Sequence, residues 1–317
     1  MFGKIMELIR AYDTIIIHRH NKPDGDAMGS QIGMKHILKE NFPEKTVYCV
    51  GDDPRFFGFM DDAVMDEIPD TAYQGALALI LDCGSAAMIC DDRYRLAAKT
   101  ARFDHHIRCE QVADQEVIDT SYESCCGMVT AFAVESGLHI NQKAGLALYT
   151  GMLTDSGRFR YDSTSSRTFL LAAELIKTGF DTNELYRCLY ADDFSNRLLK
   201  AKFTLKIRFT ENNVAYIYTT ADEIKEYGAS EFAISRGMVG TMSDLKGVDI
   251  WVNFTETDSG VLCELRSSRF NINPIAVKYG GGGHQKASGA CVPDRETAMA
   301  MLKDLDAVQE GTYEQNN

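Results

Sequence analysis

The residues of this chain that are best suited to chemistry are histidines and aspartates gathered in four short polar segments. In chain order, the segments are His20-Asn21-Lys22-Pro23-Asp24-Gly25-Asp26, Asp82, Asp104-His105-His106 and Asp155. Carboxylates brought close together repel one another unless cations neutralise them. Two divalent ions about 3.5–4 Å apart would do this while activating a water for attack on a phosphoryl group. The residue types therefore predict a two-metal hydrolase if the fold brings the segments together.

Three of the four segments follow stretches that have the character of buried strands. The strand-like runs are Ile15 to Ile17, Thr46 to Val50, Ala76 to Leu81 and Thr100 to Phe103. The first and third are continuously apolar, as strands covered on both faces must be, and a helical period separates the first two runs. The sequence therefore predicts a parallel α/β sheet with flanking helices. Loops beyond the carboxyl ends of such strands converge on one crevice, which we expect Asp155 to reach from the end of a helix.

The ligand types also indicate which metals the site would take. A site rich in carboxylates, with a few imidazoles and no thiolate, favours Mn²⁺ or Mg²⁺ over a closed structural Zn²⁺. Two Mn²⁺ ions are the first expectation because of the imidazoles, with Mg²⁺ or Co²⁺ as alternatives. Any one of these aspartates alone could be an ordinary cap at the end of a strand, so the prediction depends on their joint occurrence.

The length of 317 residues is enough for two domains of the usual size, about 100–200 residues each. We expect an α/β metal-binding domain at residues 1–185, a charge-rich helical connector at 186–208 and a smaller mixed α/β domain at 209–317. Strands predicted for the last domain are Val214 to Thr220, Gly247 to Thr255 and Val261 to Leu265. A glycine run from Gly280 to Gly283 follows them, next to His284.

Composition and charge argue against several classes of protein. The 33 basic and 46 acidic residues give a net charge of −13 and a pI near 5.0, which disfavours long duplex nucleic acid as a partner. We find neither an apolar run of roughly 20 residues nor a recognisable export signal. Nine cysteines without a C-x-x-C pair suggest neither a disulfide framework nor a thiolate zinc site. We therefore expect no membrane association and a reducing, cytoplasmic location.

Taken together, the polar segments resemble the four motifs of the DHH phosphoesterase superfamily, in the order in which that family has them. A second resemblance lies in the C-terminal part of the chain. There, Gly280-Gly281-Gly282-Gly283-His284-x-x-Ala287-Ser288-Gly289, preceded by Leu265-Arg266-Ser267, is similar to the substrate-binding motif of the DHH-associated C-terminal domain. The two resemblances cover nearly the whole chain.

The resemblance implies a role for each of these residues. One metal ion would be held by His20, Asp24 and Asp82, and the other by Asp26, Asp82, His105 and Asp155. Asp82 and His106 would be the catalytic residues, with Asp82 bridging the metals and His106 contacting the reacting phosphate. Asp104 would orient a histidine or the backbone at the end of its strand. The substrate's remote end would be bound by Arg266, Ser267, Gly281, Gly282, Gly283 and His284.

Within the superfamily, the two-domain layout is similar to that of nano-RNase/pAp phosphatases. These enzymes degrade very short RNA to mononucleotides and 3′-phosphoadenosine 5′-phosphate (pAp) to AMP and phosphate. The resemblance therefore implies an Mn-dependent phosphodiesterase and phosphomonoesterase whose substrates are pAp, dinucleotides and short RNA. Whether it forms a homodimer stays open.

Other functions also remain open at this point. The first alternative is a phosphodiesterase for cyclic di-AMP or pApA, and the second is a single-strand-specific exonuclease. An exonuclease for long strands needs a basic groove lined by aromatic residues, which the net charge of −13 and the single tryptophan disfavour. An inorganic pyrophosphatase ranks below these readings, and a nucleotide-sensing module without activity is a further one.

Overall fold

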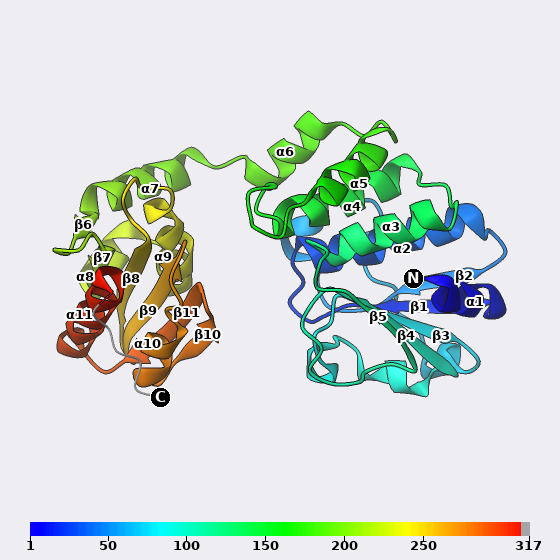
Figure 1. Cartoon of the computed structure of the whole chain (residues 1–317), viewed down its shortest axis with the longest axis horizontal. Helices are drawn as coiled ribbons and strands as arrows, with labels where there is room; N and C mark the ends of the chain where they lie inside the picture. Colours follow the sequence, from blue (N-terminus) through cyan, green and yellow to red (C-terminus); the bar gives the residue numbers. More distant parts are fainter. Residues whose placement is uncertain (312–317) are drawn as a thin grey trace. The chain divides into compact units, whose positions relative to one another are not determined.

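The computed structural model describes residues 1–311, and the chain divides into two compact units (Figure 1). The first unit comprises Met1–Ala191, and the second begins at Asp192. The division falls within residues 186–208, where the connector is expected. No helix among residues 1–311 is long and apolar enough to cross a membrane.

The first unit is built on a five-stranded parallel sheet with the strand order β2-β1-β3-β4-β5. Its strands are β1 (Thr14–His18), β2 (Thr46–Cys49), β3 (Leu77–Leu81), β4 (Lys99–Asp104) and β5 (Gln115–Ile118). Strand β2 pairs with β1 on one side, and the next strand in the chain, β3, pairs with β1 on the other side. The order of the strands therefore reverses between β1 and β3, which is where ligands bind in open α/β sheets.

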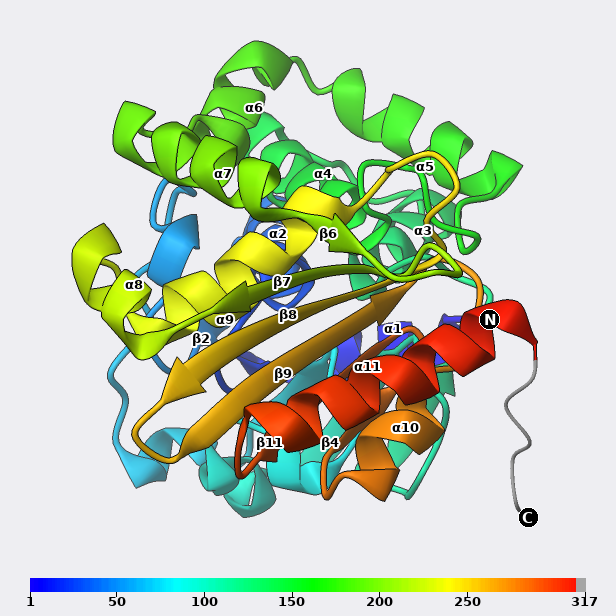
Figure 2. The same ribbon diagram turned by 90° about the vertical axis from the view of Figure 1, so that its left-hand side faces the viewer.

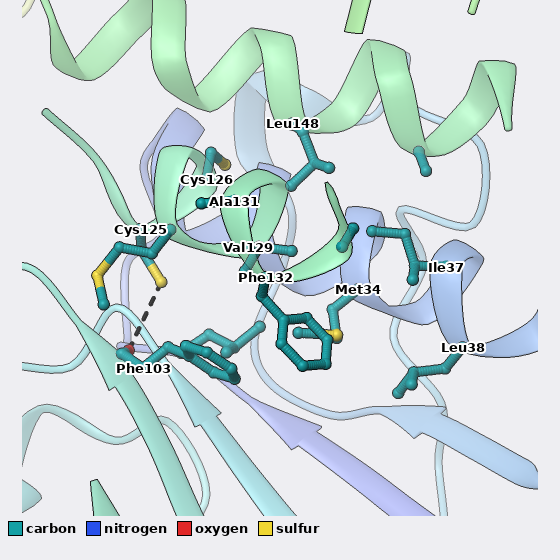
Figure 3. Packing of buried hydrophobic residues seen from close by; sticks show 14 of the residues in the cluster. Met34, Ile37, Leu38, Phe103, Cys125, Cys126, Val129, Ala131, Phe132 and Leu148 are labelled. Atoms are coloured by element: carbon teal, nitrogen blue, oxygen red, sulfur yellow. Dashed lines mark hydrogen bonds between the residues drawn. The ribbon is translucent and has the colours of Figure 1, made fainter. Parts of the chain in front are cut away.

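Helices cover one face of this sheet, and Figure 1 shows four of them, α2 to α5, on the same side. The helices of the unit are α1 (Gly3–Ala11), α2 (Gly25–Asn41), α3 (Cys125–Glu135), α4 (Gln142–Asp155), α5 (Ser166–Ile176) and α6 (Thr182–Tyr190). The core between helices and sheet is apolar and contains aromatic pairs (Figure 3). For example, the rings of Phe103 on β4 and Phe132 on α3 have centroids 5.4 Å apart. This packing fixes the helices whose ends carry polar residues.

The other face of the sheet is covered differently, by short 3-10 helices and loops. Tyr73 and Tyr94, from the 3-10 helices Asp70–Tyr73 and Asp92–Leu96, are buried there. Ile16 and Ile80 are fully buried on this side of the sheet. The continuous apolar character of β1 and β3 thus has the expected cause, which is burial on both faces.

The second unit is a six-stranded mixed sheet with the order β10-β11-β9-β8-β7-β6. Its strands are β6 (Arg208–Phe209), β7 (Ala215–Thr219), β8 (Ile250–Thr257), β9 (Gly260–Ser267), β10 (Gly282–His284) and β11 (Ala287–Val292). Only β7 and β8 pair in parallel. Its helices are α7 (Phe194–Lys206), α8 (Ala221–Tyr227), α9 (Glu231–Val239), α10 (Asn273–Lys278) and α11 (Arg295–Glu310).

Two apolar cores lie on opposite faces of this sheet. Figure 2 shows α9 on one side of the strands and α11 on the other. Val252 and Phe254 of β8 belong to the core that includes residues of α10 and α11. Ala215 and Ile217 of β7 belong to the core that includes residues of α7, α8 and α9. Successive residues of a strand point to opposite faces, so the two sets follow from the alternation of the sequence.

The structure confirms the expected fold class, a parallel α/β domain followed by a smaller mixed α/β domain. The hairpin of β8 and β9, the helix starting at Asn273-Pro274 and the C-terminal helix also match the prediction. The α-helices and strands not predicted from the sequence are α1, β5, β6, α8, α9, β10 and β11. Most of these are short, and β10 consists of two glycines and a histidine, which carry no hydrophobic period.

Candidate active site

The four polar segments of the first unit come together at the carboxyl ends of its strands. His20 follows β1, Asp82 follows β3, and His105 and His106 follow β4. Asp24 is the N-cap of α2, and its carboxylate accepts hydrogen bonds from the amides of residues 26 and 27. The first turn of α2 and the last turn of α4 complete the cluster with two further carboxylates, those of Asp26 and Asp155.

The side chains in this cluster approach one another at distances typical of ligands that share a cation. The Nε2 atom of His20 lies 3.7 Å from Asp24 Oδ1 and 3.5 Å from Asp82 Oδ2. These separations are too long for hydrogen bonds. They match two ligand atoms that are each about 2.0–2.2 Å from one metal ion. His20, Asp24 and Asp82 therefore have the arrangement of one metal position.

A second group of side chains surrounds His105 in the same manner. Its Nε2 atom lies 3.6 Å from Asp26 Oδ2, 3.6 Å from Asp82 Oδ1 and 3.5 Å from Asp155 Oδ2. Asp82 is thus the residue that reaches both groups, one oxygen toward each histidine. This is the arrangement that a carboxylate bridging two ions requires.

Asp82 is held in a strained and buried position. Its φ is +55°, in the left-handed region that residues with a side chain rarely adopt, and its backbone N–H donates to the carbonyl of Phe103 at 3.1 Å. The side chain is 2% exposed, and Oδ1 has no hydrogen-bond partner among residues 1–311. A buried carboxylate oxygen without a donor is costly unless a cation binds it, so the residues present fit a metal.

The N-terminus of α3 holds Asp26 in place. The backbone N–H groups of Cys125 and Cys126 donate to its two carboxylate oxygens at 2.7 and 2.8 Å. Unpaired amides at the start of a helix stabilise an anion. The sequence shows these two cysteines as an adjacent pair. In the structure their backbone amides bind the carboxylate of Asp26, and the thiol of Cys126 donates to the backbone carbonyl of Asp26 at 3.5 Å.

His106 differs from the other histidines because its ring is half exposed and bound on one side. Its Nδ1 lies 2.8 Å from Asp104 Oδ1, and its backbone N–H donates to the same oxygen at 3.3 Å. Asp104 also accepts a hydrogen bond from Arg102, and both of these side chains are fully buried. Arg102 in turn lies 3.3 Å from Glu116 on β5. The contact with Asp104 therefore engages Nδ1 and fixes the orientation of the His106 ring.

The pKa values of the site reflect its crowded charges. Burial, together with the charges of Asp82, Asp155 and Asp24, raises the pKa of Asp26 well above its usual value. Burial, together with the charges of Asp82 and Asp24, raises the pKa of Asp155 to about 7. Burial alone would lower the pKa of His20, but the carboxylates of Asp24 and Asp82 outweigh it and raise the pKa to about 11. Divalent cations would relieve this repulsion among the carboxylates.

Two functional supports were missed by the sequence analysis. One is Arg102, described above. The other is the fully buried Arg19, which donates to Asp52 Oδ1 and to the backbone carbonyl of Asp52, both at 2.6 Å, and to the carbonyl of His20 at 3.1 Å. Asp52 Oδ2 also accepts a hydrogen bond from the backbone amide of Lys22. Asp52 thus holds the loop that carries His20 and Asp24 in position. The available signal was an arginine at the end of a buried strand, one residue before His20 in one case and two residues before Asp104 in the other.

In the second unit, the expected substrate-binding residues fall into two groups. His284, Ala287 and Arg266 are successive partners across β10, β11 and β9 and therefore lie on one face. Gly282, Gly289 and Glu264 form the next row of the same face. Arg266 donates to Glu264 Oε2 at 3.1 Å and remains partly exposed.

Ser267 and Gly283 are placed differently. Ser267 is 6% exposed, and its Oγ accepts hydrogen bonds from the amides of Arg269 and Phe270 at 3.1 and 2.7 Å. A Cβ on Gly283, whose φ is +137°, would come within 2.7 Å of the carbonyl of Ala287. A Cβ on Gly281 would lie 2.1 Å from the carbonyl of Gly289. These residues thus shape the turns and the close pairing of β10 with β11.

Each of the two units matches a known protein family. The description "DHH family, N-terminal domain" matches residues 14–152, and "DHHA1 domain" matches residues 213–311. The chain is 34% identical over 311 residues to the bifunctional oligoribonuclease and PAP phosphatase NrnA of Bacillus subtilis, with 97% of this chain and 98% of that protein covered. The chain belongs to the DHH family. Of the candidate residues in the first unit of this DHH protein, Asp155 alone lies just beyond the matched range.

Two further curated proteins and one solved structure are also similar to the chain. A probable NrnA of Streptococcus mutans is 36% identical over 308 residues, covering 96% of this chain and 98% of that protein. The crystal structure of an exopolyphosphatase-related protein from Bacteroides fragilis has the same fold, with a TM-score of 0.86 at 24% identity over 99% of this chain and 97% of that one. The cyclic-di-AMP phosphodiesterase PdeA of Listeria monocytogenes is 25% identical, and the match covers 49% of its length.

Proposed function

We propose that this DHH-family chain, a phosphoester hydrolase, degrades short oligoribonucleotides to mononucleotides and converts pAp to AMP and phosphate. The observation that carries the proposal is the position of Asp82. Its buried carboxylate lies between His20 and His105, and its Oδ1 has no hydrogen-bond partner among the described residues. Relatives named for these two activities match nearly the full length of the chain, which supports the choice of substrates.

The donor set of the first unit fits two divalent ions. His20, Asp24 and Asp82 would hold one of them, and Asp26, Asp82, His105 and Asp155 would hold the other. When bound, such ions activate a water, polarise the phosphoryl group and stabilise the charge that develops on it. We propose Mn²⁺ as the physiological metal because oxygen ligands are combined here with imidazoles, with Mg²⁺ or Co²⁺ as substitutes.

The residues of the chain itself orient the substrate and the ligands. His106, half exposed and bound through Nδ1 by Asp104, presents Nε2 to the reacting phosphate. Arg102 stabilises the charge of Asp104, since its guanidinium and the imidazole of His106 both contribute to lowering the pKa of that carboxyl despite its burial. Asp104 therefore stays ionised and keeps the imidazole in one orientation.

The second unit supplies recognition of the part of the substrate that does not react. Arg266 and His284 lie in one row of the sheet and offer charge-assisted hydrogen bonds to a phosphate, while Gly282 keeps the surface beside them low. Across residues 261–290, four basic side chains and one acidic side chain give a local charge of +3, from Arg266, Arg269, Lys278 and Lys286 against Glu264. This local charge suits one or two phosphates, whereas the net charge of −13 disfavours long nucleic acid.

The test is a substrate panel with the full-length protein, freed of metal by chelation and then supplied with Mn²⁺, Mg²⁺ or Co²⁺. The panel contains pAp, pApA, oligoribonucleotides of two to five residues, cyclic di-AMP and long single strands. We expect release of AMP and phosphate from pAp and of mononucleotides from the short RNA, and restoration of activity by Mn²⁺. Preference for cyclic di-AMP would favour the phosphodiesterase alternative, and processive degradation of long strands would favour the exonuclease.

A further inference from the structure

The face of the second sheet that carries Arg266 and His284 changes its character along the strands. The row of His284, Ala287 and Arg266 is polar, and the next row contains Gly282 and Gly289 beside Glu264, which accepts a hydrogen bond from Arg266. The row after that pairs Leu262, half buried, with Cys291, exposed. Neighbouring rows lie about 6.6–6.8 Å apart along a strand. Cationic groups and an apolar patch thus lie at opposite ends of this face, with the two glycines between them. We call these three rows the floor.

This floor is open above its middle row. A Cβ built on Gly282 would meet no atom of the described chain within 4 Å, and one on Gly289 would make only ordinary contacts. The opposite face of the same strands packs on α10 and α11. A planar group could therefore lie on the glycine row without displacing a side chain.

Helix α9 borders the floor on the side of β8. The amide of Asn253 on β8 donates to the carbonyls of Ile234 and Ser235 at 2.8 Å each, and Arg236 Nε donates to Glu264 Oε1 at 3.1 Å. Figure 2 shows the first turn of α9 on the side of the arrowhead of β8, toward the hairpin that joins β8 to β9. That is the end of the floor where Leu262 and Cys291 lie.

The first turn of α9 carries an exposed aromatic ring. Phe232 is 68% exposed, so its ring has a free face, and its contact with water costs hydrophobic free energy in the absence of a ligand. The guanidinium of Arg236, one turn further along α9, lies 5.7 Å from the centroid of this ring. Arg236 is also bonded to Glu264, so it is anchored to the sheet and supports the ring from one side.

We infer that Phe232, supported by Arg236, stacks on a nucleobase of the substrate whose phosphate is bound at Arg266 and His284. The inference rests on the proposed function and adds a specificity-determining residue to it. The three rows match a nucleotide: the phosphate lies at the cationic end, the sugar over the glycines and the base at the apolar end. Stacking on an aromatic ring accepts any base, so the site would select nucleotides without selecting their sequence.

The test compares Phe232→Ala with the wild-type enzyme on pApA and on two analogues of it, each lacking one of the two bases. On pApA we expect kcat/KM to fall about 5- to 150-fold, the range of one base–aromatic stack. The loss should disappear with the analogue that lacks the stacked base and persist with the other. Phe232→Trp should keep near wild-type efficiency, because its ring also stacks.

Phe209→Ala is the matched control, since this phenylalanine is also exposed and lies on β6, the edge strand opposite to β10. It should leave all three substrates unaffected. An efficiency of Phe232→Ala within twofold of wild type on pApA would overturn the inference, and so would an equal loss on all three substrates. A wild-type enzyme that cleaves neither pAp nor short RNA would overturn the proposed function, and this inference with it.

Discussion

At the scale of single residues, Asp82 has the most demanding position, because one carboxylate faces both histidine groups. We predict that Asp82→Asn lowers kcat on pAp at least about 100-fold, since even residues that only support metal ligands typically contribute 10- to 100-fold. Asparagine keeps the volume and removes the charge. The measurement is phosphate release with saturating Mn²⁺, accompanied by a melting curve. Turnover within a few-fold of wild type in a folded, metal-exchanged variant would contradict the two-metal assignment.

Substitution of Arg102 tests whether His106 depends on the buried ion pair between Arg102 and Asp104. We predict that Arg102→Met reduces kcat about 10- to 100-fold with little change in KM, because Asp104 then lacks its cation and orients His106 less firmly. Breaking a buried ion pair also costs about 3–5 kcal/mol of stability, so folding must be checked. Arg102→Lys keeps the charge and should recover part of kcat. If KM rose while kcat stayed the same, the positioning role would be wrong.

His18 provides a prediction for the pH dependence of stability. Its ring is fully buried between Tyr73 and Tyr94, and both ring nitrogens lack hydrogen-bond partners within residues 1–311. Burial lowers its pKa from 6.5 to about 4. Below pH 6.5 the unfolded chain binds a proton that the folded chain does not, so stability is present above this pH and falls by up to roughly 3 kcal/mol as the pH drops to 4.

Replacement by phenylalanine removes this titration while conserving the shape of the ring. In urea titrations of the chelator-treated protein between pH 7.5 and 4, His18→Phe should lose less stability than wild type. Groups that titrate in both proteins cancel in the difference. Parallel pH profiles for the two proteins would show that His18 is not the cause.

At the scale of elements, the contact between α2 and α4 sets the geometry of the metal site, because α2 carries Asp26 and α4 ends at Asp155. A Cβ on Gly29 of α2 would lie 2.4 Å from the carbonyl oxygen of Ala147 on α4, which no side-chain rotation can relieve. We predict that Gly29→Ala separates the helices, destabilises the protein by roughly 1–3 kcal/mol and weakens Mn²⁺ binding.

The control for this prediction is Gly3→Ala in α1, where a Cβ would meet no described atom within 4 Å. That change should leave Mn²⁺ affinity unaltered and stability equal or slightly higher, because alanine favours helices. Thermal unfolding and metal titration of both variants provide the measurement. Unaltered Mn²⁺ affinity in Gly29→Ala would show that the helix contact does not determine the site.

At the scale of the whole molecule, the residues proposed for catalysis and those proposed for remote recognition belong to different units. We predict that Arg266→Ala and His284→Ala raise KM on pAp and dinucleotides and also lower kcat, because remote binding energy orients the substrate as well. Mn²⁺ binding should be unchanged. Hydrolysis of bis-p-nitrophenyl phosphate, which lacks the remote end, should stay close to wild type. Loss of Mn²⁺ binding, or equal damage to both kinds of substrate, would place these residues in the catalytic centre or the core instead.

The first sheet and the position of the candidate site could be predicted from the sequence alone. Apolar runs that end in aspartate or histidine identified three strands of the first sheet and the site at their ends, because burial on both faces leaves a direct compositional mark. The spacing of His20, Asp24 and Asp26 likewise fixed their common loop, since neighbours in a tight turn remain neighbours in any fold. Local chemistry and periodicity were sufficient for these features.

Other features were decided only by the tertiary structure. The pairing of β9, β11 and β10 places Arg266 and His284 on one face and turns Ser267 to the other, and this depends on a register between distant strands. Helix α9 brings Phe232 to the same face although no motif marks it. Arg102 can stabilise the charge of Asp104 only because the fold buries it next to Asp104 and Glu116. A sequence shows which groups are present, but the partner of a buried charge and the face of a side chain follow from long-range packing.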